Sequence, residues 1–279
     1  MSLVEVVVLA VVQGAAEVLP VSSTGHAALA RMWLGAGREA AAVTGALHLA
    51  TAAAVALAAR QRIGAAIGEG VRAIARPGLL QRSPGAWDAA LILAGSAVSL
   101  ATSAALRPFV ALWAEAPIAV GLGLVITGAA LGSTAIAPRP STAPDARSER
   151  PPLAGMVAAG LVHGLGMAPG ASRMGAALVV LLWLGVTPAR ALDLALAITA
   201  PALVAEGLRV LAAPALGADV LVAGLLVAFA CASAAALGLR ALVERRLVGA
   251  LCLWVIPLGL ATVAYARALP GFALALDFR

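Results

Sequence analysis

A polar cluster near the start of the chain carries the residue types of phosphoryl-transfer chemistry. Residues 13–26 read QGAAEVLPVSSTGH, within sequence that is otherwise almost wholly apolar. The Ser23 hydroxyl is the predicted nucleophile, and His26 is a candidate base that orients or deprotonates it. Glu17 could hold His26 or bind a metal ion, and direct attack by His26 or by water stays open. Because ionisable groups are costly in apolar segments, we interpret Glu17 and His26 as functional, together with Arg173 in the other half of the chain.

The same cluster contains a predicted turn that could bind an anion. Pro20 disfavours helix at the residue before it, so the helix that carries Gln13 and Glu17 on one face should end there. Residues 21–25 then form a turn in which Gly25 permits a left-handed backbone and the amides converge on an anion. The predicted substrate-binding residues of this cluster are Gln13, Ser22, Thr24 and Gly25.

A second polar cluster interrupts an apolar run in the other half of the chain. Residues 169–175 read PGASRMG, and the Pro-Gly pair should break a helix. Gly170 and Ser172 are predicted to bind substrate, and the Arg173 guanidinium suits bidentate phosphate binding. An Arg at membrane depth requires an anion, which Glu17 would supply at rest and a phosphate group during turnover. We therefore expect the two clusters to be halves of one site.

Composition predicts an all-α polytopic membrane protein. Of the 279 residues, 62% are hydrophobic and 11% are charged, and the mean hydropathy is +1.02. Several apolar runs approach the roughly 20 residues that cross a bilayer. The net charge of +6 comes from Arg alone and fits the positive-inside rule, so no nucleic-acid partner is expected. Cys231 and Cys252 lie far from His or Asp and are interpreted as packing residues.

The apolar runs predict two inverted repeats, each a re-entrant hairpin followed by three spans. The first repeat covers 1–136, a Pro-rich cytoplasmic linker covers 137–152, and the second repeat covers 153–279. The hairpins are expected at about 3–35 and 153–188, and the six full spans at about 41–59, 86–106, 116–136, 191–213, 217–239 and 247–266. This topology places twelve Arg in cytoplasmic loops and six at the outer ends, with both termini outside.

Both clusters resemble motifs of the bacterial undecaprenyl-diphosphate phosphatases of the bacitracin-resistance type. That family carries Q/E-G-x-x-E-x-x-P-x-S-S-x-G-H, which 13–26 match in full, and P-G-x-S-R-S-G, which 169–175 match in all but one position. The likeness extends to residues 48–51, 116–121, 126–128 and 184–201, and so covers most of the chain.

The resemblance implies a hydrolase of the bacterial plasma membrane with two re-entrant loops and an outward-facing active site. It would remove the terminal phosphate from a C55 polyprenyl diphosphate and recycle the carrier lipid for peptidoglycan synthesis, which links it to cell-wall biogenesis, cell shape and bacitracin resistance. The family's Glu, second Ser, His and Arg fall on Glu17, Ser23, His26 and Arg173. The expected cofactor is a divalent cation, Mg²⁺ or Ca²⁺, and the expected partners are the lipid and the membrane. A homodimer is left open.

Departures from the family pattern affect the surroundings of the second cluster. They are Met174 for a usual Ser, Ala177 for a common Thr and His163 for a frequent Gln. Gln13 stands where some members have a second Glu, which leaves Glu17 as the sole carboxylate of its helix end. A cation held mainly by the diphosphate, with Glu17 as its protein ligand, would still fit.

Further ionisable residues lie outside the two clusters. His48 and His163 each lie alone on an apolar stretch, where packing is at least as good an interpretation as catalysis. Glu206 and Arg209, three residues apart, are interpreted as a local pair. The alternative function is a transporter or flippase of an anionic lipid or small anion, because inverted repeats with broken helices also build such carriers. The co-occurrence of hydroxyl, His, Glu and Arg favours the enzyme.

Overall fold

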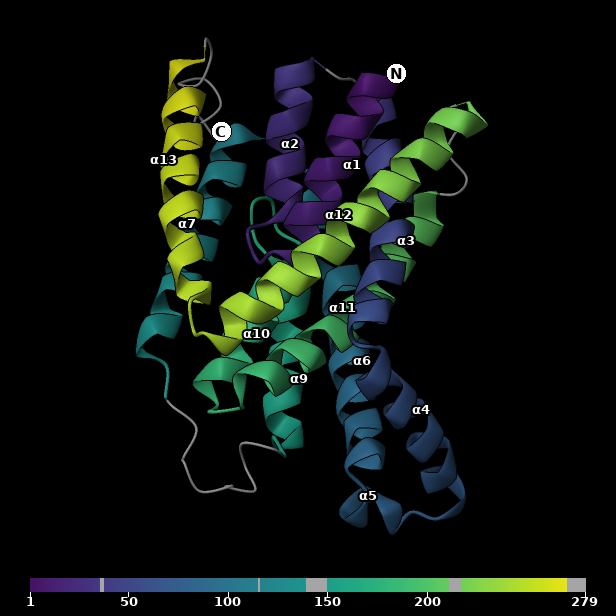
Figure 1. Ribbon diagram of the computed structural model, residues 1–279. Coiled ribbons are helices and arrows are strands. Elements are labelled where there is room, and N and C mark those ends of the chain that lie inside the picture. Colours follow the sequence, from purple (N-terminus) through teal and green to yellow (C-terminus); the bar gives the residue numbers. More distant parts are fainter. Residues whose placement is uncertain (36–37, 115, 139–149, 211–216, 270–279) are drawn as a thin grey trace.

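The computed structural model describes residues 1–35, 38–114, 116–138, 150–210 and 217–269, and their regular structure is entirely helical (Figure 1). The all-α prediction is confirmed. Most of the predicted linker 137–152 lies outside the described residues. The first half contains α1 (Leu3–Val18), α2 (Ser23–Leu34), α3 (Arg38–Ala58), α4 (Arg60–Ala75), α5 (Leu79–Arg82), α6 (Pro84–Ala111), α7 (Pro117–Ser133) and the 3-10 turn η1 (Thr134–Ile136). The second contains α9 (Leu153–Leu165), α10 (Arg173–Trp183), α11 (Pro188–Val210), α12 (Ala218–Glu244), η2 (Val248–Leu251) and α13 (Cys252–Ala268).

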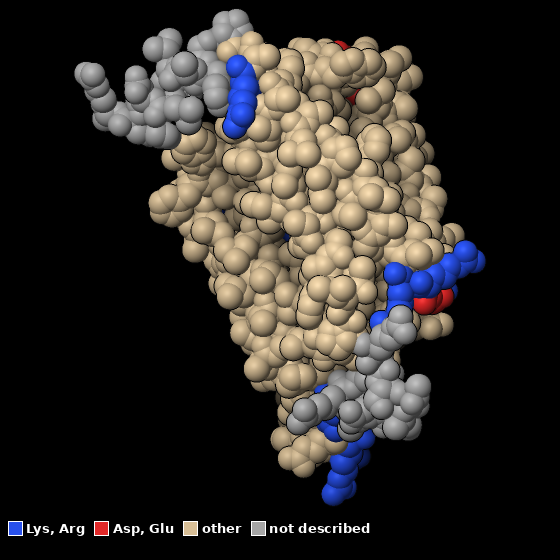
Figure 2. Space-filling view, turned by 90° about the vertical axis from the view of Figure 1, so that its left-hand side faces the viewer, with Lys and Arg blue, Asp and Glu red and all other residues tan. Residues whose placement is uncertain are grey.

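The described helices confirm a polytopic membrane protein. Five helical segments are long and apolar enough to cross a bilayer: Pro84–Ala111, Pro117–Ile136, Pro188–Arg209, Ala218–Glu244 and Val248–Ala268. The sixth predicted span, 41–59, falls in a pair of helices, Val43–Ala58 and Arg60–Ala75, which are bent by 79° and count as one span if taken together. On the face drawn in Figure 2, charged side chains gather near the two ends and leave a broad, almost uncharged belt between them.

The segment 60–82, which the predicted topology places in a cytoplasmic loop, is mostly helical. Its five Arg residues conceal an apolar stripe along α4, whose buried Ala66 and Ala73 face α6. At Gly70 a Cβ atom would lie only 2.6 Å from the Cβ atom of Ala89, so α4 and α6 are in close contact. Tertiary packing of this stripe therefore keeps an Arg-rich segment helical.

Two short hairpins approach each other from opposite ends of the molecule, α1 with α2 from one end and α9 with α10 from the other (Figure 1). Helix α1 packs along α12, and α9 packs along α6, so the first helix of each hairpin contacts a long helix of the other half. Small residues allow both approaches: a Cβ atom at Gly14 would lie 3.0 Å from Ala228 Cα, and one at Gly160 would lie 2.9 Å from Gly95 Cα. The two halves interlock, while their division into inverted repeats stays a prediction.

Candidate active site

The first turn, residues 19–22 between α1 and α2, differs from the predicted turn 21–25. Helix α1 ends at Val18, as Pro20 indicated, but α2 already begins at Ser23. Ser22 is the N-cap of α2, and its Oγ accepts a hydrogen bond from the Gly25 amide at 3.1 Å. The left-handed residue is Ser22, with φ of 75°, rather than the expected Gly25. The cap hydrogen bond fixes this backbone and starts the helix three residues earlier than predicted.

The nucleophile candidate is bonded directly to a carboxylate. Ser23 Oγ donates to Glu17 Oε2 at 2.5 Å, and Gln13 Nε2 donates to the same oxygen at 2.9 Å. Glu17 is 4% exposed and Ser23 is 7% exposed. A hydroxyl held against a buried carboxylate is a nucleophile with its proton acceptor already in place.

His48 lies beside this carboxylate. The sequence favoured packing at least as much as catalysis for this residue. Its Nε2 is 3.8 Å from Glu17 Oε2. Its Nδ1 lies 2.7 Å from the Thr44 carbonyl oxygen, which can only accept, so Nδ1 carries the proton and Nε2 faces Glu17. In the sequence His48 is an isolated ionisable residue in an apolar segment, and this pattern does not predict that it lies close to Glu17.

His26 does not contact Ser23 in the way that the sequence suggested. Its Nδ1 donates to the Ser22 carbonyl at 2.9 Å, and its Nε2 accepts from Trp254 Nε1 at 3.0 Å. The two rings are stacked with centroids 6.4 Å apart. Thr24 also turns towards the cap, with its Oγ1 3.2 Å from Ser22 Oγ. The hydrogen bond expected between His26 and Ser23 is therefore made by Glu17 instead, because the first turn of α2 directs the imidazole towards α13.

The second turn, residues 166–172 between α9 and α10, is held by a threonine of α7. Thr127 Oγ1 donates to the Gly170 carbonyl at 3.1 Å and accepts from the Ser172 amide at 3.1 Å. Gly170 has φ of 74°, a conformation that favours glycine. Ser172 is the N-cap of α10, and its Oγ accepts from the Gly175 amide at 3.1 Å. Arg173 is thus the first residue of a helix with a fixed start.

The two turns touch each other. A Cβ atom at Gly25 would lie 3.1 Å from Gly170 Cα, and one at Gly175 would lie 2.9 Å from Pro20 Cβ. The structure thereby brings the two sequence clusters together at the point where the hairpins meet. Neither the Ser23 and Thr24 amides nor the Arg173 and Met174 amides have a hydrogen-bond partner among the described residues. Two helix N-termini with free amides form a suitable environment for a phosphate group.

Arg173 is 7% exposed, and its ion-pair partner is Glu206 rather than the expected Glu17. Its Nη1 lies 3.7 Å from Glu206 Oε1, and the same carboxylate also pairs with Arg107 at 2.6 Å and with Arg209 at 3.3 Å. The predicted local pair of Glu206 and Arg209 is present, but Glu206 also reaches the candidate site. This contact could not be predicted from the sequence, because α6 and α10 approach α11 only in the folded protein.

His163 lies between three helices and has hydroxyl partners on both nitrogens. Nδ1 is 2.7 Å from Ser99 Oγ, and Nε2 is 3.0 Å from Thr199 Oγ1. It is fully buried, so its geometry is that of a packing histidine.

A small cavity of about 130 Å³ lies beside the first cluster. It is lined by Gln13, Thr24, Arg31, Thr44, His48 and Met167 among others.

The donor set does not form a dedicated metal site. No group of three or more His, Cys, Asp or Glu side chains in the described part of the chain is arranged to hold a metal ion. Glu17 is the metal ligand that the sequence suggested, and one of its oxygens already accepts two hydrogen bonds.

Comparison with known proteins agrees with these motifs. Residues 6–261 match the model of the family described as bacitracin resistance protein BacA. The undecaprenyl-diphosphatase of Desulforapulum autotrophicum is 32% identical over 193 residues, covering 67% of this chain and 68% of the relative. That of Desulfosudis oleivorans is 31% identical over 210 residues, covering 71% and 73%. That of Sphingopyxis alaskensis is 33% identical over 186 residues, or 66% of each chain. The chain belongs to the bacitracin resistance protein BacA family.

Proposed function

We propose that the chain is an undecaprenyl-diphosphate phosphatase, which hydrolyses a C55 polyprenyl diphosphate to the monophosphate and inorganic phosphate. Relatives of this name cover about two thirds of the chain. The observation that carries the proposal is the hydrogen bond from Ser23 to the buried Glu17, next to the turn that bears Arg173. Recycling of the carrier lipid for the cell wall follows from this activity.

Ser23 would attack the terminal phosphorus while Glu17 accepts the hydroxyl proton. The bond between phosphorus and the bridging oxygen breaks, and the lipid monophosphate leaves with the electron pair and takes the proton from Glu17. Water then attacks the phosphoserine while Glu17, again ionised, accepts a proton from it. The bond between phosphorus and Ser23 Oγ breaks, Glu17 returns the proton to this oxygen, and inorganic phosphate is released.

Arg173 and the free amides of the two turns would neutralise the phosphoryl oxygens. The negative charge on these oxygens is the main obstacle to attack, so positioning and charge neutralisation account for most of the catalysis. Substrate binding would draw Arg173 from its 3.7 Å contact with Glu206 towards the phosphate. His48, facing Glu17, would help to set the carboxylate for proton transfer.

The hydroxyl and carboxylate pair favours this function over transport, because a carrier needs binding groups and no activated nucleophile. We place the enzyme in the bacterial plasma membrane with the site facing outward, in keeping with the excess of Arg in the predicted cytoplasmic loops. A divalent cation would be held mainly by the diphosphate, with Glu17 as its protein ligand.

The decisive experiment is phosphate release from C55 diphosphate and from short-chain analogues by the purified protein in detergent. Release should occur with the native protein, fall with a chelator, and return with Mg²⁺ or Ca²⁺. A mock preparation from cells that lack the protein serves as the blank for contaminating phosphatases. Phosphate release no greater than this blank would contradict the proposed function, and release that is insensitive to chelation would contradict the need for a cation alone.

The proposed orientation can be tested with single-cysteine probes. With Cys231 and Cys252 replaced, Ser83→Cys should label from the cytoplasm and Ala218→Cys from outside, since they lie at the starts of α6 and α12. Labelling of both from one side of intact cells contradicts the inverted arrangement.

A further inference from the structure

The end of α11 away from Glu206 carries a second cluster of charged residues. Asp88 pairs with Arg190 at 2.5 Å and with Arg62 at 2.7 Å. Asp193 pairs with Arg62 at 3.4 Å and with Arg240 at 2.6 Å. This network joins α4, α6, α11 and α12, and none of its members contacts the candidate active site.

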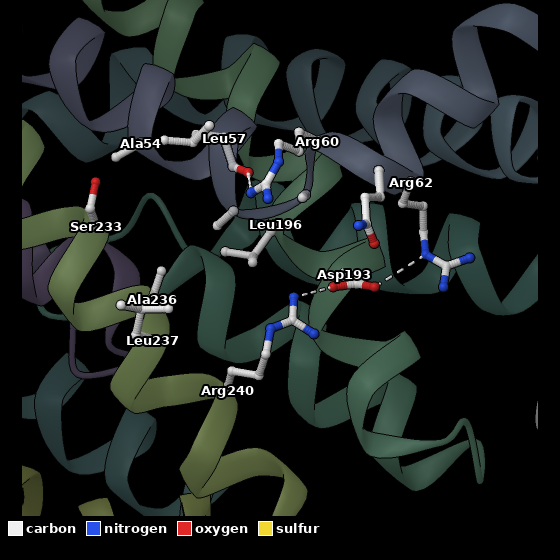
Figure 3. Close-up of a pocket in the computed structure, with 13 residues that line it drawn as sticks. Ala54, Leu57, Arg60, Arg62, Asp193, Leu196, Ser233, Ala236, Leu237 and Arg240 are labelled. Atoms are coloured by element: carbon white, nitrogen blue, oxygen red, sulfur yellow. Dashed lines mark hydrogen bonds and ion pairs between the residues drawn. The ribbon is translucent and has the colours of Figure 1, made fainter.

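A cavity of about 460 Å³ opens beside this network, at the bend between α3 and α4. Arg60 and Arg62 line it from α4, Asp193 from α11, and Arg240 from α12. Figure 3 shows Asp193 between Arg62 and Arg240, with Arg60 near the α3 wall. Asp193 and Glu206 are thirteen residues apart on α11, about 20 Å along the helix, so this cavity is separate from the active site.

The cavity has an excess of positive charge. Three guanidinium groups line it against one carboxylate, and both oxygens of that carboxylate are already used by Arg62 and Arg240. Arg60 donates one hydrogen bond, from Nη1 to the Leu57 carbonyl oxygen at 3.1 Å, and its other N–H groups have no partner in the described chain. Ser233 Oγ also lines the cavity, buried and without a hydrogen-bond partner in the described structure. These groups call for an anion with several acceptor oxygens.

Apart from its charged groups, the wall of the cavity is mostly apolar. It includes Ala54, Leu57, Ala58, Leu196, Ala236 and Leu237. Leu57 is 46% exposed and Leu237 is 75% exposed, so the wall continues onto the apolar surface of the helix bundle. A soluble anion would gain nothing from this wall, whereas the acyl chain of a membrane lipid would lie along it.

From this combination we propose that the cavity binds the phosphate headgroup of an anionic membrane lipid. The phosphate would lie among Arg60, Arg62 and Arg240, at the N-terminus of α4, whose cap residue Ala59 provides no side-chain hydrogen bond. The acyl chains would follow Leu57 and Leu237 into the bilayer. Basic pockets between membrane helices recognise lipid headgroups in this way. The site is independent of the proposed phosphatase activity.

The proposal can be tested by native mass spectrometry of the full-length protein in detergent, titrated with dioleoyl phosphatidylglycerol, dioleoyl phosphatidylcholine or inorganic phosphate. The native protein should bind phosphatidylglycerol most tightly. Arg60→Gln, which breaks no ion pair, should weaken this binding about fivefold. Ala236→Phe, which fills the cavity, should weaken it at least as much. The matched control Arg72→Gln removes the same charge from an exposed position of α4 outside the cavity and should leave binding unchanged.

The melting temperature of each preparation reports its folding, and this readout does not depend on the proposed phosphatase activity. A retained melting temperature with weakened lipid binding supports the proposal. Equal binding of both lipids, a loss in Arg72→Gln equal to that in Arg60→Gln, or native binding by Ala236→Phe overturns it. Displacement of the lipid by millimolar inorganic phosphate would assign the cavity to a soluble anion and would also overturn it.

Discussion

The first and second turns are capped in the same way but lead into helices that begin with different functional groups. In each, a serine caps the following helix and accepts from the amide three residues on, Ser22 from Gly25 and Ser172 from Gly175, both at 3.1 Å. The residue after the cap is Ser23 at the start of α2 and Arg173 at the start of α10. The same backbone position therefore presents a nucleophile from one hairpin and a cation from the other.

The two turns also differ in what surrounds them. Ten residues before Ser23, Gln13 donates to Glu17 and so belongs to the reactive cluster. Ten residues before Arg173, His163 is bound by hydroxyls of α6 and α11 and so anchors its hairpin. The reactive groups are therefore concentrated around the first turn, whereas the second turn holds the charge of Arg173 in a fixed place.

The largest effect should come from removing the nucleophile or its base. We expect Ser23→Ala to abolish hydrolysis, and Glu17→Gln to lower kcat by about 10²- to 10⁴-fold, the usual range for general-base catalysis. Lipid diphosphate binding should survive in Ser23→Ala because Arg173 and the turn amides remain. Single-turnover phosphate release and lipid binding are the measurements. Substantial turnover by Ser23→Ala, with none by His26→Ala, would transfer the nucleophilic role to His26 or to water that it activates.

The function of the second turn should depend on the planar guanidinium group of Arg173 and not on its positive charge alone. Arg173→Lys keeps the positive charge but loses the planar fork, so kcat/KM should fall about 10²-fold or more with little change in thermal stability. Steady-state kinetics with a melting curve of the same preparation tests this. Near-native turnover by Arg173→Lys or Arg173→Ala would remove this residue from the mechanism.

Gly170→Ala should disturb the placement of Arg173 without touching its charge. The left-handed backbone costs an alanine about 1 kcal/mol, and its Cβ atom would also collide with the Val120 carbonyl oxygen and approach the Leu124 amide to 2.8 Å. The matched control is Gly185→Ala, which has the same φ of 75° but open space around its Cβ position. We expect loss of stability and activity in the first variant and only the backbone cost in the second. Equal melting temperatures would contradict the close packing of the second turn.

The smallest effects should come from the two caps. Ser22→Ala and Ser172→Ala each lose one N-cap hydrogen bond, so each should cost about 1 kcal/mol of stability. Both should retain far more activity than Ser23→Ala. Thermal unfolding and phosphate release of the two variants check whether the caps are equivalent, and a loss of activity as complete as that of Ser23→Ala would give the cap hydroxyl a direct chemical role.

Local signals in the sequence predicted the helix ends but not the contacts between helices. Pro20 and Gly170 marked the breaks correctly, because backbone chemistry at those positions is local. The partners of Ser23, His26 and Arg173 depended on distances across the fold, so His26 was assigned a contact that Glu17 makes. The helical α4 was missed because its Arg residues hid an apolar face that only packing on α6 reveals.

The hydrogen bond between Trp254 and His26 has a consequence for biogenesis. Trp254 lies near the start of α13, the last described helix, whereas His26 lies in the second helix of the chain. The face of α1 that bears Gly14 is likewise covered only after α12, which packs against it, has been synthesised. During synthesis the nascent chain therefore carries a polar, unfinished N-terminal hairpin through the insertion of most of its length. The contacts of this hairpin with α12 and α13 can form only after those last helices have been synthesised.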